Sequence, residues 1–178
     1  YKENYSPTYP GAVSIFVNSM NKLSIFKDSI IVFGSIFFKK KLSNNYVNIN
    51  LSKKILSSQS KQYVQKFYDI QSKSNADIIE IHNRPNYINK LTKLNSKLVL
   101  YFHNDPVTMI GSKTVNDRIN LLNVCSKIIF NSEWSKKQYL KDLKNFYHKS
   151  KKLEVIHQST AKTKINLKKK EKLITFVG

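Results

Sequence analysis

Three of the four histidines in this 178-residue chain follow short apolar runs and stand at the start of polar segments. They are His82, His103 and His157, and Ser132 occupies a similar position after another apolar run. If these runs are parallel strands, their carboxyl ends meet at one edge of a sheet, where ligands bind in open α/β folds. The pattern therefore predicts a ligand site at that edge, with imidazole rings facing the ligand.

Arg84 strengthens this interpretation, because it is one of only two arginines and follows His82 and Asn83 directly. A guanidinium at a strand end can bind an anionic group through two parallel hydrogen bonds. The other arginine, Arg118, is expected on the surface of a helix. Trp134 is expected to pack against the protein rather than to stack on a ligand.

The segment after His103 allows two interpretations. Asn104, Asp105 and Pro106 are typical of a turn that ends a strand, because Asx side chains and proline favour turns. The same residues could instead hold His103 toward a ligand. Spacing alone leaves both possibilities open.

Several well-defined catalytic motifs do not occur in the sequence. It contains no Gly-x-Ser-x-Gly pattern of a serine hydrolase and no His-x-x-x-His or Cys-x-x-Cys pattern of a metal site. The Gly-x-Gly-x-x-Gly fingerprint of dinucleotide-binding sites and the P-loop of nucleotide-binding sites are absent as well. Gly11 precedes a predicted helix and would let an anion approach the helix N-terminus, although it also fits a plain turn. The single cysteine, Cys125, excludes an internal disulfide and suits a reducing compartment.

Helical and strand patterns alternate along the chain. Helices are predicted over 12–23, 61–73, 87–94, 115–125 and 133–147, and strands over 29–33, 46–51, 76–81, 97–102, 127–130, 152–156 and 172–177. The run at 29–33 is typical of a buried strand, and 46–51 of a short edge strand. This alternation predicts an α/β fold with a Rossmann-like parallel sheet flanked by helices on both faces.

The charge balance is strongly basic, with 31 Lys and Arg against 11 Asp and Glu and a net charge of +20. Nearly all of these cations are lysines spread along the chain, whereas nucleic-acid-binding proteins favour arginine. The excess is therefore interpreted as a solvated lysine coat or as a surface for anionic lipid or polyphosphate. The candidates for lipid contact are Lys39, Lys40, Lys41, Lys53 and Lys54. The longest near-continuous apolar run, 30–38, is too short to span a membrane.

Six segments, in their order and spacing, resemble the first domain of GT-B glycosyltransferases of the family-4 kind. They are 4–13, 76–85, 98–105, 127–136, 153–157 and 173–178, and together they extend over nearly the whole chain. Three features depart from the family pattern. Pro10-Gly11 replaces paired glycines, His157-Gln-Ser-Thr160 replaces Asn-Gly-Val-Asp, and the expected first strand would precede residue 1, so the sheet would lack a central strand.

The resemblance implies a retaining, metal-independent enzyme that transfers a sugar from a nucleotide-sugar donor to a glycan or lipid-linked acceptor of the cell envelope, with no separate cofactor. It implies an acceptor-side domain over 1–160, a linker over 161–171 and the first strand of a nucleotide-sugar-binding domain over 172–178. The chain is thus expected to be a fragment, inactive alone because the catalytic C-terminal half lies outside it. It is expected in the cytoplasm, with peripheral contact to the inner face of the plasma membrane.

The resemblance also assigns roles to individual residues. His103 would orient the transferred sugar, Gly11 would approach the donor diphosphate, and Ser132 with Glu133 would close the floor of the cleft. The remaining acceptor- or substrate-binding candidates are His82, Asn83, Arg84, Asn104 and Asp105. Two alternatives remain: a GT-B-like sugar-phosphate synthase or epimerase, and a basic α/β module that binds nucleic acid, which the spread of the lysines disfavours.

Overall fold

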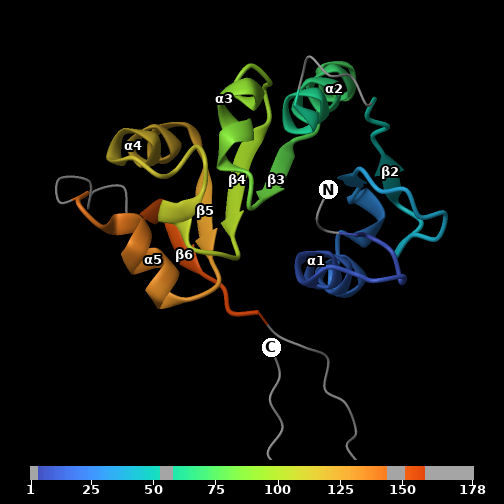
Figure 1. Ribbon diagram of the computed structural model, residues 1–178, viewed down its shortest axis with the longest axis horizontal. Helices are drawn as coiled ribbons and strands as arrows, with labels where there is room; N and C mark the ends of the chain where they lie inside the picture. Colours follow the sequence, from blue (N-terminus) through green and yellow to red (C-terminus); the bar gives the residue numbers. More distant parts are fainter. Residues whose placement is uncertain (1–3, 53–57, 144–150, 159–178) are drawn as a thin grey trace, which may run out of the picture.

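Parallel strands organise the protein into two sheets (Figure 1). The computed structural model describes residues 4–52, 58–143 and 151–158. Four strands pair in chain order: β3 (Ile78–His82), β4 (Lys97–Phe102), β5 (Lys127–Phe130) and β6 (Leu153–Val155). The other sheet pairs β1 (Val32–Gly34) with β2 (Tyr46–Asn48). The expectation of an α/β chain with a parallel sheet flanked by helices is confirmed.

Helices lie between successive strands of the four-stranded sheet, because parallel neighbours need a crossover connection, whereas β1 leads to β2 without a helix. The helices of the chain are α1 (Ala12–Leu23), α2 (Gln59–Ser74), α3 (Ile88–Leu91), α4 (Val115–Val124) and α5 (Glu133–Leu140), with 3₁₀ turns η1 (Lys27–Ser29), η2 (Pro85–Tyr87) and η3 (Pro106–Thr108). Proline occupies the first position of both η2 and η3. The N–H group that proline lacks would have no hydrogen-bond partner within the turn at this position.

One face of the four-stranded sheet carries the main core. Because side chains alternate along a strand, Leu98, Leu100 and Phe102 of β4 all point to this face and are buried there. Side chains from α2, α3, α4 and α5 pack against them, including the fully buried Ile88 and Tyr139. These contacts hold the strands in register.

The opposite face of this sheet is covered differently. Phe16 of α1 packs there against Tyr101 and Ile129, close to the carboxyl ends of the strands. Toward the start of the strands the same face carries Ile78, which is exposed, and a salt bridge between Lys127 and Glu154. The polar and half-exposed groups of the sheet therefore gather on this second face.

The cap of α4 explains why this helix begins and ends where the pattern predicts. Thr114 and Asp117 form a reciprocal capping box at its start. At its end, the Lys152 ammonium group donates to the carbonyl oxygens of Leu122 and Cys125. This positive charge stabilises the helix because it lies at the negative end of the helix dipole. Cys125 is a free, buried thiol, and burial raises its pKa to about 12.

Two predicted elements differ from the structure. The strand predicted to be buried over 29–33 is only β1, which pairs with β2 alone among the described strands and leaves the neighbouring Ile31 exposed. The helix predicted over 133–147 ends at Leu140, because Lys141 turns to an extended ψ and Asp142 adopts a positive φ of 66°. The end of that predicted helix, the linker 161–171 and the strand 172–177 lie outside the described residues.

Two side-chain predictions are wrong. Trp134 does not pack, because α5 turns it outward and leaves 55% of it exposed. Arg118 is not on the helix surface but is 3% exposed. Its guanidinium donates to the carbonyl oxygens of Lys113 (2.9 Å) and Lys141 (2.7 Å), so that burial is offset by hydrogen bonds that link α4 to the end of α5.

Among the helices of the described residues, none combines the length and the apolar character that crossing a bilayer requires.

Replacing Arg118 with Met should destabilise the protein by roughly 2–4 kcal/mol, because the buried guanidinium and its hydrogen bonds to the carbonyl oxygens of Lys113 and Lys141, which join α4 to the end of α5, are lost. Urea denaturation measures the loss. The control is Lys93→Met, which alters an exposed lysine and should change stability by no more than about 0.5 kcal/mol. Equal losses in the two variants would contradict the structural role of Arg118.

Candidate functional site

The carboxyl edge of the four-stranded sheet brings two of the predicted histidines into contact. His82 is the last residue of β3, and His103 follows the last residue of β4. The parallel register places His82 beside Tyr101. Because His103 lies two residues after Tyr101, the rings of His82 and His103 lie on the same face of the sheet. Nδ1 of His82 lies 2.8 Å from Nε2 of His103, a hydrogen-bonding distance.

The histidine pair continues into polar side chains at both ends. Nε2 of His82 lies 3.0 Å from the carboxylate of Glu80, two residues earlier on the same face of β3. The other ring nitrogen of His103, Nδ1, is hydrogen-bonded to the side-chain amide nitrogen of Gln158, which follows β6. Four side chains from three segments of the chain thus form one continuous hydrogen-bonded row.

Aromatic rings enclose this row. Tyr101 stacks on His103 with ring centroids 4.3 Å apart and an interplanar angle of 8°. Phe16 of α1 meets the His103 ring edge-on at 5.1 Å. The Tyr101 hydroxyl donates to the carbonyl oxygen of Ile156 at 2.6 Å. These contacts leave His103 only 8% exposed and fix the plane of its ring.

Two asparagines hold the backbone of His103. Asn83 accepts from the His103 N–H through Oδ1 at 2.8 Å, and its own N–H donates to Tyr101. Asn83 adopts a positive φ of 52° to do this, a conformation that asparagine tolerates better than most residues. From the other side, Nδ2 of Asn131 donates to the His103 carbonyl oxygen at 2.7 Å. Both neighbouring strands therefore fix the position of His103.

Burial decides the charge of the site. Burial and, to a smaller extent, the nearby His82 lower the pKa of His103, the Glu80 carboxylate opposes them only in part, and the resulting pKa is about 4. Burial raises the pKa of Glu80, but the hydrogen bond and the charge of His82 lower it by more, so that the pKa falls below its ordinary value. At neutral pH the row therefore contains a neutral His103 and an ionised Glu80.

Other predicted residues serve the turns around this row. The Arg84 guanidinium donates to the carbonyl oxygen of Asn83 at 2.9 Å, just before η2. Asp105 accepts from the N–H of Val107 and caps η3, which supports the turn interpretation of this segment. Asn104 is exposed. Ser132 caps α5.

Three further candidates have no recorded hydrogen bond to this row: Glu133, Gly11 and His157. Glu133 is exposed in the first turn of α5. Gly11 caps α1 with a φ of −76°, which other residues also adopt, so the backbone conformation does not require glycine. His157 is exposed, and its neighbour Gln158 is the residue that reaches His103.

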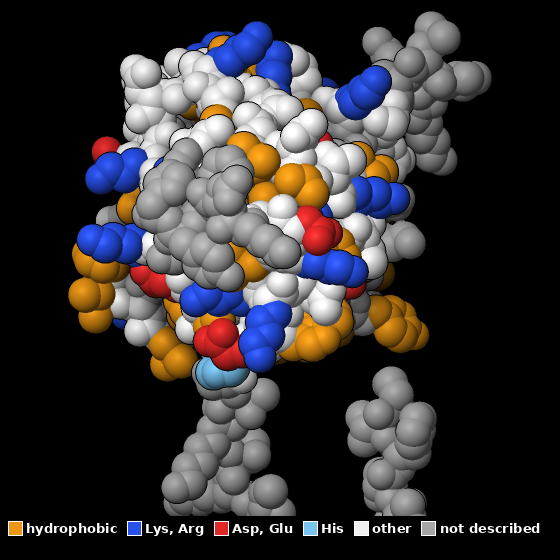
Figure 2. Space-filling view, turned by 90° about the vertical axis from the view of Figure 1, so that its left-hand side faces the viewer, with side chains coloured by type: hydrophobic (Ala, Val, Ile, Leu, Met, Phe, Trp, Pro, Cys, Tyr) orange, Lys and Arg blue, Asp and Glu red, His pale blue; other side chains and the backbone are white. Residues whose placement is uncertain are grey.

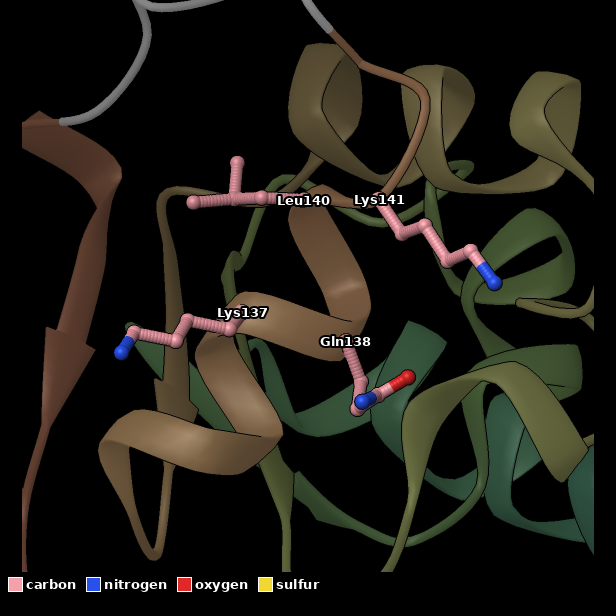
Figure 3. A pocket seen from close by; sticks show the side chains of 4 residues that line it. All are labelled: Lys137, Gln138, Leu140 and Lys141. Carbon is pink, nitrogen blue, oxygen red and sulfur yellow. The ribbon is translucent and has the colours of Figure 1, made fainter.

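A surface hollow of about 370 Å³ lies elsewhere, along the second half of α5. Figure 3 shows that the side chains lining it do not converge, since Lys137 and Lys141 point in opposite directions. The hollow therefore lacks the convergent polar groups of a ligand site. Within the described ranges, no group of three or more His, Cys, Asp or Glu side chains is arranged to hold a metal ion.

No role in the site was predicted from the sequence for three residues: Glu80, Asn131 and Gln158. The alternation of a strand places Glu80 on the same face as His82, so that its position could have been recognised. Asn131 follows β5 as Asn83 follows β3, a parallel that also lay in the sequence. No pattern in the sequence predicts the position of Gln158.

Comparison with known proteins finds no family model that matches this chain and no matching curated protein. The glycosyltransferase resemblance stays a prediction from the motifs.

Lowering the pH from about 6.5 to 4 should destabilise the protein through His103. In this window the unfolded ring binds a proton, whereas the native ring, with a pKa of about 4, does not. The loss attributable to this group is about 3 kcal/mol, at ~1.4 kcal/mol per pKa unit. Urea denaturation at several pH values measures it against His103→Gln, which cannot titrate. Parallel stability curves for the two proteins would contradict the lowered pKa.

Proposed function

We propose that this chain is the acceptor-side part of a GT-B glycosyltransferase, which transfers a sugar from a nucleotide-sugar to a glycan or lipid-linked acceptor. The observation that carries the proposal is the hydrogen-bonded pair of His82 and His103 at the carboxyl edge of a parallel sheet. Ligands of open α/β sheets bind beyond this edge, and the resembling motifs place the same two histidines there.

The neutral charge of His103 suits a sugar. A neutral imidazole carries one bare nitrogen that can accept from a hydroxyl group, whereas an anion would favour a cation. His103 is neutral at pH 7 because its pKa is about 4. Its backbone is fixed on both sides by Asn83 and Asn131, so that the ring would meet a bound sugar without having to reorganise.

In the proposed reaction, the bond between the sugar and the diphosphate breaks, and a bond from the same carbon to an acceptor oxygen forms with retained configuration. The electron pair of the broken bond leaves with the nucleoside diphosphate, and the proton of the acceptor hydroxyl passes to an oxygen of that departing diphosphate. Fixed cations and helix N-termini would stabilise the negative charge of the diphosphate without a metal. By resemblance these groups belong to the nucleotide-sugar-binding domain of such enzymes.

The other candidates would act around His103. Gly11, at the start of α1, would let the donor diphosphate approach. Phe16 of the same helix contacts the His103 ring, which places α1 beside the pair. Arg84, Asn104 and Asp105 would contact the acceptor from the loops after β3 and β4.

A GT-B-like sugar-phosphate synthase or epimerase would use the same edge, and the reaction product distinguishes it. The nucleic-acid alternative has less support. Figure 2 shows lysine and arginine side chains scattered among hydrophobic ones over one face of the molecule. The two arginines are half-buried Arg84 and buried Arg118, which donates to backbone carbonyl oxygens.

His103→Ala in the complete gene product should lower sugar transfer by about 10²-fold, because the sugar loses a fixed orienting group. Release of nucleoside diphosphate from a panel of nucleotide-sugars, with membrane glycolipids as acceptors, measures it. The matched control is His157→Ala, which removes an exposed histidine near the same edge and should leave transfer unchanged. Equal rates for His103→Ala and the unmodified protein would overturn the proposed function.

We also propose peripheral contact with an anionic membrane in the cytoplasm, at the segment that joins α1 to β1. Leu23, the last residue of α1, is 80% exposed, and Ile25 and Phe26 in the segment that follows are 89% and 67% exposed. Lys22 and Lys27 flank them and are exposed. Apolar side chains beside cations are typical of surfaces that insert into the headgroup region of anionic lipid.

Of the lysines first considered, Lys39 and Lys40 are exposed, Lys41 is half-buried against Tyr46, and Lys53 and Lys54 lie outside the described residues.

The double variant Ile25→Ser, Phe26→Ser should bind vesicles of phosphatidylglycerol and phosphatidylcholine about tenfold more weakly, because two inserted side chains are lost. Co-sedimentation at low and high salt measures the binding, which should weaken with salt. Trp134→Ser, on exposed α5, is the control and should bind as the unmodified protein does. Binding that neither salt nor the double variant weakens would contradict the assignment.

A further inference from the structure

The direction of each hydrogen bond in the row can be derived from the chemistry of its ends. The ionised carboxylate of Glu80 only accepts, so that Nε2 of His82 must carry the proton. A neutral His82 then has a bare Nδ1, which accepts from Nε2–H of His103. That leaves Nδ1 of His103 as an acceptor, in agreement with its partner, the amide nitrogen of Gln158, which only donates.

We propose that Glu80 is a positioning residue which, acting through His82, holds His103 in the Nε2–H tautomer, with the Nδ1 lone pair directed toward the edge of the sheet where ligands bind. Glu80 and His82 lie on one face of β3, and the parallel register with β4 brings His82 to His103. Glu80 is half-exposed, and the row becomes more buried toward His103.

Gln158 marks the place of a ligand group in this arrangement. It is exposed and follows β6, whereas His103 is buried and held by hydrogen bonds from both sides. A ligand hydroxyl that replaced the Gln158 amide would donate to the same Nδ1. This last step rests on the proposed function, and it gives the site a preference for hydroxyl donors over anions, which cannot donate.

The groups that face the two rings support a single tautomer. Around His103 are His82, the stacked ring of Tyr101, the edge of Phe16 and Gln158. Within the described residues, Glu80 is the only acidic side chain recorded in hydrogen-bonding contact with this row. Removing its acceptor would leave His82 free to donate from Nδ1 instead, and His103 would then take the Nδ1–H form.

The experiment is ¹⁵N NMR of the protein labelled at histidine, at about pH 8, well above the ordinary histidine pKa. His82→Gln and His103→Gln assign the signals. In the unmodified protein, Nδ1 of His103 should appear as a bare nitrogen and Nε2 as a protonated one. Glu80→Leu should shift His103 toward the Nδ1–H form, whereas Glu80→Gln, which retains an acceptor oxygen, should restore the original tautomer.

Glu154→Leu is the matched control, because Glu154 lies on the same face of the sheet, is similarly exposed and pairs with Lys127 instead of a histidine. It should leave the His103 signals unchanged. A protonated Nδ1 in the unmodified protein, or an unchanged tautomer in Glu80→Leu, would overturn the positioning role.

Kinetics of the complete gene product separate this inference from the proposed function. Glu80→Leu should lower kcat about tenfold, and Glu80→Gln should recover most of that loss, since the misplaced proton affects orientation rather than folding. A tautomer shift in Glu80→Leu without any sugar transfer by the unmodified protein would overturn the proposed function and leave the role of Glu80 standing.

Discussion

The hydrogen bond between His82 and His103 depends on the register of β3 and β4, and the rest of the site depends on that bond. The register sets Ile79 against Leu98 and Ile81 against Leu100, and these side chains are buried under the helices. A slip of one residue would turn His82 to the core face and the apolar side chains to the other. The same apolar contacts that stabilise the fold therefore also align the two imidazole rings.

One face of the four-stranded sheet stabilises the fold, and the other face carries the candidate site. Helices α2 to α5 cover one face with an apolar core, and a buried Arg118 links two of them through carbonyl oxygens. The other face has α1 only near the carboxyl ends of the strands, and there Phe16 and Tyr101 enclose His103. A rigid apolar layer behind the sheet allows the polar row in front of it to hold a fixed geometry.

Much of the fold follows from local patterns in the sequence. The strand predicted over 97–102 is β4, because a continuous apolar run bounded by polar residues has few alternatives. The helix over 12–23 and the capped start of α5 are likewise confirmed. The failures are nonlocal: Arg118 is buried because carbonyl oxygens from two segments surround it, and α5 ends early because of the backbone at Lys141 and Asp142.

The sequence by itself determined which residues end the parallel strands, since strand length and polar termination are local properties. Those local properties are enough to place His82, Asn83 and His103 at one edge of the sheet. Strand alternation also puts Glu80 on the face of His82, but only the tertiary structure decided that the Gln158 amide, which is 55 residues from His103, joins them. Strand order and burial bring these groups together, and burial keeps His103 neutral, because desolvation depends on everything packed around a ring and not on its neighbours in the chain.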